Sequence, residues 1–270
     1  MIPFFRRIRH KLANDNQFLK YSRYAIGEII LVVIGILIAL SINNWNEERL
    51  KKNALQERLK NLAENLDQDV GGLTIWKNIH EFRFHAMQHL LTISGHEPNY
   101  FPDFENNTYF IPKDQWISGW KGEIPNQYDA EFVKVAIRHI DVLSELQPNS
   151  SVLEEIKDDG LYSFFEDPDL TKAVDNYYLN YERRLGASEN ENIRKYKNDW
   201  IDAMNLKGFH AENISDSQEV IQWLENSPQA TANLRNLASN AKWRYDSSDV
   251  LIKEAKQLIE EINTYLGQNN

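Results

Sequence analysis

The stretch "HEFRFHAMQH" holds the side chains best suited to chemistry in this chain. Glu81, His85 and His89 are spaced four residues apart, so in a helix they share one face. Carboxylate and imidazole groups at this spacing can bind zinc or a similar metal, although a tetrahedral site needs a fourth ligand. His96, His139 or an aspartate would have to supply that ligand. The alternative is a polar helix face that carries a Glu–His pair.

The chain lacks the motifs of the common enzyme classes. It contains no G-x-S-x-G elbow, no phosphate-binding loop and no dinucleotide fingerprint. It also has no Cys, which excludes disulfides, thiolate metal sites and cysteine nucleophiles. Carboxylate pairs such as Asp158 and Asp159 are common on acidic surfaces, and a glycosidase would also need a cleft. We therefore expect no enzymatic activity and no cofactor, with a metal-dependent envelope enzyme as the alternative.

Charge is distributed unevenly along the 270 residues. Residues 1–66 carry 11 Lys and Arg against 6 Asp and Glu, whereas the other 204 residues carry 19 against 34. Binding to nucleic acid requires clustered positive charge to neutralise phosphates. The acidic majority of the chain therefore argues against a nucleic-acid partner.

The stretch "YAIGEIILVVIGILIALSINNW" is the longest apolar run, and Ala25–Ile42 contains a single charged residue. A membrane span needs about 20 mostly apolar residues, whereas the core of a signal peptide has about 7–15. Tyr24 and Trp45 flank the run, and such rings favour the two membrane interfaces. We predict a transmembrane helix over residues 25–45 in a lipid bilayer. Cleavage of a signal peptide near Ser41 is the alternative.

Two features inside this segment suggest further roles. Glu28 is a carboxylate one turn inside the run, which indicates either an interfacial side chain or a functional charge such as a proton relay. Gly27, Gly35 and Ala39 recur at multiples of four, and small residues on one stripe let two helices approach closely. The stripe predicts self-association, so a homo-oligomer is one expected assembly.

Positive charges on either side of the segment predict its orientation. Six Lys and Arg precede it, with a dense cluster at residues 6–11, and five follow it among residues 49–60. We predict that residues 1–24 are a basic cytoplasmic segment. The N-terminal residues 2–12 also have an amphipathic pattern, which favours a short helix on the anionic inner leaflet. The C-terminal domain is then periplasmic, anchored in the inner membrane.

The string "MIPFFRRIRHKL" followed by "YAIGEIILVVIGILIALSINNWNEER" resembles the start of a family of uncharacterised single-pass membrane proteins. This is a domain-of-unknown-function family common in Bacteroidota-type Gram-negative bacteria. The residues that carry the resemblance are Phe4, Phe5, Arg6, Ile8, Arg9, Tyr24 to Glu28 and Asn43 to Asn46. The resemblance implies an inner-membrane anchor and a helical extracytoplasmic domain. It brings no catalytic residues.

Beyond the membrane segment, residues 46–75 predict a helical stalk that continues into a domain over residues 76–270. Apolar residues recur in a heptad-like pattern, which suits either a coiled coil or one helix of a bundle. The Gly71-Gly72 pair should weaken or kink this helix. The six apolar positions are Leu55, Leu59, Leu62, Leu66, Val70 and Leu73.

Helix signals return after residue 127, with few signs of strands. The apolar pattern predicts a helix over about 128–147, and start signals predict helices that run to about Gly160, Leu185, Leu206, Asn226 and Leu266. The corresponding start signals are Ser151 with Glu154, Asp167-Pro168, Ser188 with Glu191, Ser215 with Gln218, and Ser227-Pro228. We predict an all-α protein: one transmembrane helix followed by an elongated helical bundle.

Residues 95–126 are predicted to form an aromatic-rich, Pro-containing connection with one short hairpin around Asn106-Asn107. Its aromatic side chains either cap the bundle or expose a binding surface. Taken together, the sequence predicts a membrane-anchored interaction or scaffold module of the cell envelope, which binds another copy or an unknown envelope protein. A ligand-sensing bundle that acts through a partner is a further alternative.

Overall fold

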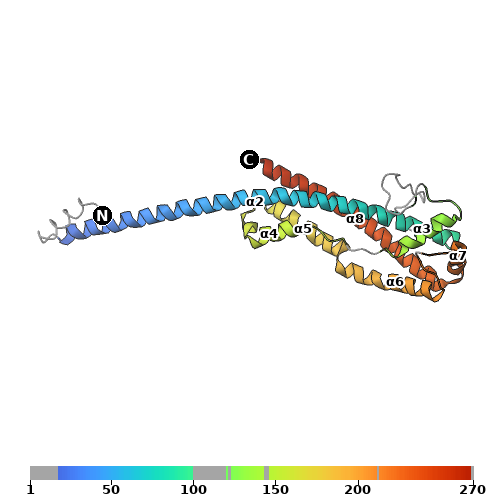
Figure 1. Cartoon of the computed structure of the whole chain (residues 1–270). Helices are drawn as coiled ribbons and strands as arrows, with labels where there is room; N and C mark the ends of the chain where they lie inside the picture. Colours follow the sequence, from blue (N-terminus) through green and yellow to red (C-terminus); the bar gives the residue numbers. More distant parts are fainter. Residues whose placement is uncertain (1–17, 100–119, 121–122, 143–145, 212, 269–270) are drawn as a thin grey trace. The chain divides into compact units, whose positions relative to one another are not determined.

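A computed structural model of the chain describes residues 18–99, 120, 123–142, 146–211 and 213–268. Every regular element in these residues is helical, as predicted. The predicted N-terminal amphipathic segment 2–12 and the hairpin near Asn106-Asn107 lie outside the described residues. The elements are α2 (Phe18–Ile93), α3 (Ala130–Ile140), α4 (Ser151–Asp158), the 3₁₀ helix η1 (Leu161–Phe164), α5 (Pro168–Leu185), α6 (Ala187–Leu206), α7 (Ser217–Asn226) and α8 (Pro228–Gln268) (Figure 1).

The chain divides into two compact units, residues 1–56 and residues 57–270. In the first unit the structure describes only the beginning of α2. The second unit contains the rest of α2 and all the other described helices. The boundary falls inside the region predicted as a stalk, residues 46–75.

Helix α2 is continuous through Gly71 and Gly72, the pair at which the sequence predicted a weakened or kinked helix. The cost of glycine in a helix, about 1 kcal/mol each, is offset because the helix on both sides packs within the second unit. A Cβ built on Gly72 would lie 3.5 Å from Leu146 Cδ1, which is ordinary contact. Leu66 and Leu73, which flank the pair, are both 0% exposed.

The leucine stripe of α2 is a face of the bundle. Leu59, Leu62, Leu66 and Leu73 are completely buried within one copy of the chain, whereas Val70 is partly exposed. A two-stranded coiled coil would leave such a stripe open in one chain until a second copy covered it. For these residues the structure therefore agrees with the bundle alternative.

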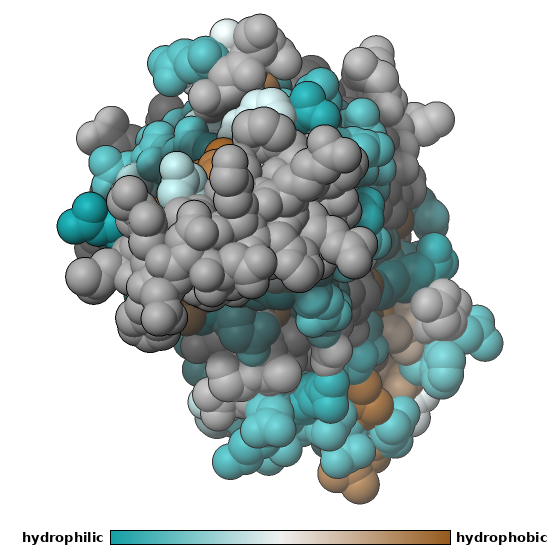
Figure 2. Space-filling model, turned by 90° about the vertical axis from the view of Figure 1, so that its left-hand side faces the viewer, coloured by the Kyte–Doolittle hydropathy of each residue, from teal (hydrophilic) through white to brown (hydrophobic). Residues whose placement is uncertain are grey.

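In the second unit a hydrophobic core lies where α2, α3, α6, α7 and α8 meet. Phe82, Phe132, Trp200 and Leu234 are among its fully or almost fully buried members. Helices α5 and α6 follow one another along α8, and α7 packs against both α3 and α8. On the face drawn in Figure 2, the described surface is mostly hydrophilic with hydrophobic side chains scattered between.

Two of the predicted helix starts are confirmed in detail. Helix α5 begins at Pro168, and the Asp167 carboxylate accepts hydrogen bonds from the backbone N–H groups of Asp169 (2.8 Å) and Leu170 (3.2 Å). Helix α8 begins at Pro228, as predicted from Ser227-Pro228. Proline suits the first helical position because its missing N–H would have no partner there.

Two other predicted starts are displaced by one residue. The cap of α7 is Asp216, which accepts from the Gln218 N–H at 2.8 Å, and not Ser215. The cap position of α4 is Ser150, whose hydroxyl donates to Glu154 at 2.7 Å instead of capping the backbone. In both cases two adjacent residues were chemically able to cap, and the periodic pattern alone did not decide between them.

Helix α3 is shorter than predicted, since it ends at Ile140 and not near residue 147. Asp129 caps its start by accepting from the Phe132 N–H at 2.9 Å. Arg83 of α2 covers its end by donating to the carbonyl oxygens of His139 (2.7 Å) and Ile140 (2.5 Å). A helix end leaves its last carbonyls without partners, so this buried cation stabilises the end at Ile140.

Candidate functional site

The apolar segment of α2 exposes its side chains in every direction. Residues 26–42 include twelve large apolar side chains between 46% and 66% exposed, and none of the most apolar 18-residue window is buried. By length and composition this part of α2 could cross a membrane. The exposed side chains are Ile26, Ile29, Ile30, Leu31, Val32, Val33, Ile34, Ile36, Leu37, Ile38, Leu40 and Ile42 within that range.

The predicted interface anchors and the small residues are also accessible. Tyr24 is 56% and Trp45 is 62% exposed, and the guanidinium of Arg49 lies 5.4 Å from the centre of the Trp45 ring. A Cβ built on Gly27 or Gly35 would meet no atom within 4 Å. Both glycines, together with the exposed Ala39, therefore leave room for a second helix.

A shallow groove of about 350 Å³ lies on another part of this surface. It is lined by Ile34, Leu37, Ile38, Ser41, Ile42 and Trp45. Its lining is almost entirely apolar and includes none of Gly27, Gly35 or Ala39. Glu28 is partly exposed and lies outside the groove.

The predicted metal ligands have separate surroundings in the second unit. His85 is 5% exposed, and burial together with the nearby Lys242 ammonium lowers its pKa to about 4. His89 packs edge-on against Phe132, with ring centres 5.1 Å apart, and burial lowers its pKa too. Burial raises the pKa of Glu81, an effect opposed by Lys77. Ammonium groups thus lie beside two of the three predicted ligands and would repel a metal ion.

The proposed fourth ligands are engaged with backbone carbonyls. His96 Nε2 lies 3.1 Å from the Leu224 oxygen, and His139 Nδ1 lies 2.8 Å from the Val135 oxygen. Across the part of the chain that the structure describes, no group of three or more His, Asp or Glu side chains is placed to hold a metal ion. The metal site therefore remains a prediction, and the described residues do not provide a complete set of ligands for it.

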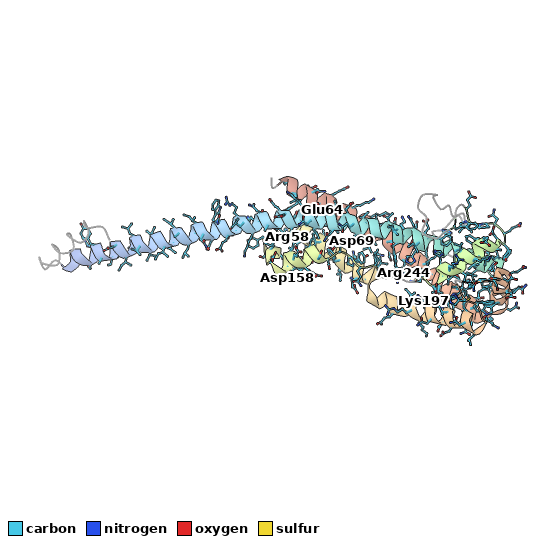
Figure 3. All side chains as sticks on the ribbon, in the orientation of Figure 1. Arg58, Glu64, Asp69, Asp158, Lys197 and Arg244 are labelled. Atoms are coloured by element: carbon cyan, nitrogen blue, oxygen red, sulfur yellow. The ribbon has the colours of Figure 1, made fainter. Side chains whose placement is uncertain are left out.

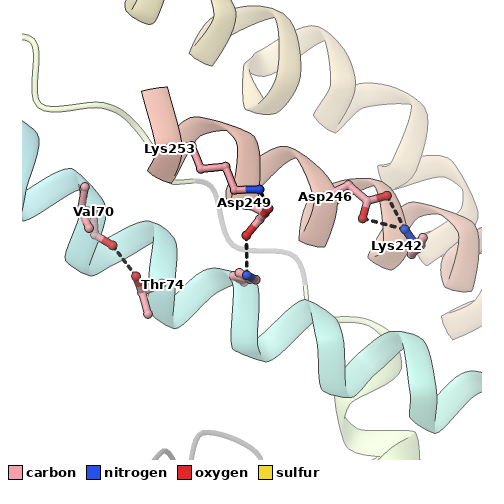
Figure 4. Close-up of polar contacts among 7 residues, drawn as sticks. Val70, Thr74, Lys242, Asp246, Asp249 and Lys253 are labelled. Atoms are coloured by element: carbon pink, nitrogen blue, oxygen red, sulfur yellow. Dashed lines mark hydrogen bonds and ion pairs between the residues drawn. The ribbon is translucent and has the colours of Figure 1, made fainter. Parts of the chain in front are cut away.

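One turn before Glu81, Lys77 of α2 pairs with Asp249 of α8, which Figure 4 draws among neighbouring charged residues of α8. Lys77 Nζ lies 2.5 Å from Asp249 Oδ1, and Lys253 Nζ lies 2.8 Å from Asp249 Oδ2. These hydrogen bonds from Lys253 and Lys77 lower the pKa of Asp249. Further along α8, Lys242 pairs with Asp246 at 2.5 Å. Of these three pairs, Lys77–Asp249 joins α2 to α8, and the other two lie within α8.

Deeper between α2 and α8 lies a group of buried polar side chains. Arg83 is 0% exposed, and its Nη1 donates to His80 Nδ1 at 2.8 Å. Burial, with repulsion from Arg244, lowers the Arg83 pKa to about 9, although Asp141 opposes this effect. Burial, Arg83 and Arg244 together keep the pKa of His80 well below its ordinary value. His80 is therefore neutral at pH 7.

A second polar contact joins α2 to α5. Asp69 is 9% exposed and accepts from the Asn149 N–H at 2.9 Å and from the Tyr177 hydroxyl at 3.1 Å. Burial raises the pKa of Asp69, and these two hydrogen bonds oppose the change. Arg58, labelled with Asp69 in Figure 3, pairs with Glu155 of α4 at 2.9 Å. These contacts fix α4 and α5 against α2.

The aromatic-rich connection contributes to the core where it is described. Trp120 packs edge-on against Phe132, with ring centres 5.0 Å apart, and its Nε1–H donates to the Glu123 oxygen at 3.1 Å. At the start of the connection, Asn99 accepts from Arg235 at 3.0 Å. The packing of Trp120 agrees with the alternative in which aromatic side chains of the connection cap the bundle. Residues 100–119 lie outside the described part.

Comparison with known proteins relates only the beginning of the chain to a family. Residues 28–90 match the model of a family of unknown function, DUF6090. The predicted resemblance to a family of unknown function is thereby confirmed over these residues. Comparisons with curated proteins and with solved structures found no match.

The DUF6090 match covers most of the exposed apolar segment, all of the buried leucine stripe and the polar residues from Asp69 to His89. The two regions of α2 thus belong to one matched sequence region. The partners of those residues on α3, α5 and α8 fall outside it.

Sequence reasoning missed Arg83 and Arg244, which are the largest buried charged side chains. Arg83 lies between Phe82 and Phe84 in the sequence, and an arginine within an aromatic run is a signal that could have drawn attention to it. The signal for Arg244 is its position in the apolar repeat of α8, between Leu237 and Leu251.

Proposed function

We propose that this chain is a membrane-anchored helical interaction module of the cell envelope. Its apolar segment spans the inner membrane once, the N-terminus is cytoplasmic and the helical unit 57–270 is periplasmic. The unit binds another copy of the chain or a second envelope protein, without catalysing a reaction.

The observation that carries the proposal is the exposure of the apolar segment on every side, whereas the leucine stripe of the second unit is buried. Fully burying one such side chain is worth roughly 1.5–3 kcal/mol. The free-energy cost of leaving a dozen such side chains in water would exceed the typical stability of a folded domain, which is about 5–15 kcal/mol. A bilayer removes this cost.

Topology is tested with single cysteines, because the chain has none. Ile75→Cys places a thiol on the second unit at a side chain that is 55% exposed. Asn14→Cys places one in the predicted cytoplasmic segment. In intact cells with a permeabilised outer membrane, a membrane-impermeant maleimide should label Ile75→Cys and leave Asn14→Cys unlabelled. Labelling of Asn14→Cys alone would reverse the orientation, and labelling of both would contradict a membrane barrier.

The interaction role is tested by photo-crosslinking from the second unit. A photoreactive residue at Leu206, which is 87% exposed, should yield a discrete crosslinked species in living cells. Placing the same residue at the buried Leu62 is the matched control and should yield none. If neither Leu206 nor any other exposed position on the unit gives an adduct, the chain has no stable protein partner and the proposal fails.

A further inference from the structure

The polar atoms without partners between α2 and α8 have one property in common. Trp76 Nε1, His80 Nε2, Ser247 Oγ and Ser248 Oγ are each buried and have no hydrogen-bond partner in the structure. A buried polar group without a partner destabilises the folded state, because it has lost its hydrogen bonds to water. Four such groups on two facing helices therefore call for a specific explanation.

Trp76, His80 and Arg244 lie close to one another. The Trp76 and His80 rings are 4.8 Å apart, and the Arg244 guanidinium lies 6.0 Å from the centre of the Trp76 ring. Ser247 and Ser248 follow Arg244 by three and four residues, so they lie on the same side of α8. We call Trp76, His80, Arg83, Arg244, Ser247 and Ser248 the donor layer.

The hydrogen-bonding roles in the donor layer can be assigned. A guanidinium can only donate, so His80 Nδ1 accepts the bond from Arg83. The neutral ring then carries its proton on Nε2, which is the atom without a partner. The indole Nε1–H of Trp76 can also only donate. Two of the four atoms are thus obligatory donors, and the serine hydroxyls can donate as well.

The charge of the donor layer favours an acceptor that is negative. Arg83 and Arg244 are 0% and 2% exposed, and each is near enough to His80 to affect its protonation. The donors of Arg83 are committed to two carbonyl oxygens and to His80. Because all six side chains are buried, the occupant has to be small.

We propose that the donor layer is a binding site for a small monovalent anion of the halide class, which accepts hydrogen bonds from Trp76 Nε1–H and His80 Nε2–H. A water molecule could accept from the same donors and donate to the serine hydroxyl oxygens, but the two buried guanidinium groups favour an occupant with negative charge. The proposal concerns the second unit alone and does not depend on the orientation of the membrane segment.

The first test locates the anion. The full-length protein is crystallised in detergent with sodium bromide, and anomalous scattering is measured at the bromine absorption edge. We expect an anomalous peak within about 3.5 Å of Trp76 Nε1 or His80 Nε2. A layer that contains only non-anomalous solvent density, or that is empty, overturns the proposal.

The second test measures linkage in solution. A ligand that binds only the folded state raises the unfolding midpoint in proportion to its saturation. The midpoint of the full-length protein in detergent should rise with chloride concentration, relative to gluconate at equal ionic strength. Equal midpoints in the two salts across the titration contradict binding of a halide.

Trp76→Phe sharpens the second test because it keeps an aromatic ring and removes the N–H. The chloride concentration for half-maximal stabilisation should increase at least tenfold, and Ser247→Ala with Ser248→Ala should act in the same direction. Thr264→Ala, on the exposed part of α8, is the matched control and should leave this concentration unchanged. If the bromide peak is present but all variants titrate like the parent, the bound ion is adventitious and the proposed donors are wrong.

Discussion

Helix α2 carries two apolar regions with opposite exposure. Leu31 and Leu37 are 66% and 56% exposed, whereas Leu62 and Leu66 are 0% exposed. In the first region apolar residues occur at nearly every position, so every side of the helix is apolar. In the second region they follow a stripe, and charged residues fill the positions between. The comparison shows that the periodicity of leucine, and not its presence, indicates which solvent the helix needs.

The largest expected effect comes from placing charge in the exposed region. Ile34→Arg with Leu37→Arg should remove the protein from the membrane fraction, because each Arg costs about 2.5–3.5 kcal/mol at the centre of a span. Fractionation of cell lysates followed by immunoblotting measures the change. Ile75→Arg, at an apolar residue of α2 that is also more than half exposed, is the control and should stay in the membrane fraction. If both variants stay in the membrane fraction equally, the exposed apolar region of α2 is not what anchors the protein.

The next effect comes from truncating the buried stripe. Leu62→Ala should lower the free energy of unfolding of the second unit by about 2–5 kcal/mol, because it removes a fully buried side chain and leaves a cavity. Urea denaturation in detergent, followed by tryptophan fluorescence, measures this loss. Leu179→Ala, at a side chain that is 56% exposed, should change stability by less than about 0.5 kcal/mol. Similar losses in the two variants would mean that the stripe is not a core face.

A pH series separates the two regions because residues 24–45 contain no histidine, whereas His80, His85 and His89 are buried in the second unit. Their folded pKa values lie below the unfolded value, so the unfolded chain binds more protons as the pH falls. Stability is therefore present above about pH 6.5 and is lost as the pH falls through that value towards 4, where His85 titrates in the folded state.

The contribution of His85 to this loss is on the order of 3 kcal/mol at pH 4. Urea midpoints between pH 7 and 4 should show the slope, and His85→Gln should reduce it. Leu62→Ala serves as the comparison variant, because it should lower stability at every pH without changing the slope. A parent protein with constant stability over this range would contradict the assignment of neutral buried histidines.

The smallest expected effect is at the polar contact between α2 and α8. Lys77 and Asp249 side chains are 25% and 32% exposed, so water screens the pair although it is 2.5 Å apart. A double-mutant cycle with Lys77→Ala and Asp249→Ala should give a coupling energy of at most about 1 kcal/mol. A coupling of several kcal/mol would show that the charged face, and not the leucine stripe, holds α2 in place.

Local features of the fold were predictable because their causes lie within a few residues. Asp167-Pro168 and Ser227-Pro228 predicted the starts of α5 and α8, since a cap and a proline at the first position act on adjacent backbone groups. The unbroken apolar run predicted the exposed region of α2 for the same reason. At Gly71-Gly72 helix α2 stays continuous despite the low helix propensity of glycine, and the flanking Leu66 and Leu73 are buried.

The polar interior was not predictable because its causes are distant in the sequence. Arg83 contacts carbonyls 56 and 57 residues away, and Asp69 meets Tyr177 after 108 residues. Glu81, His85 and His89 were correctly placed along one helix, but spacing along a helix does not reveal what the next helix presents. Here α8 presents Lys242 to His85 and not a fourth ligand.

The junction of α5 and α6 is a single residue, Gly186, with α5 ending at Leu185 and α6 beginning at Ala187. A Cβ at this position would lie 2.2 Å from the Glu182 carbonyl oxygen, so any side chain forces the backbone to move. Helix α6 has 20 residues and, at about 1.5 Å per residue, is about 30 Å long, so a small rotation at its start moves its far end noticeably. A rotation of about 5° at Gly186 would displace its far end by about 2.6 Å, roughly half the 5.4 Å pitch of one helical turn. One hydrogen atom in place of a methyl group thus sets the alignment of Trp200 and Met204 with the core.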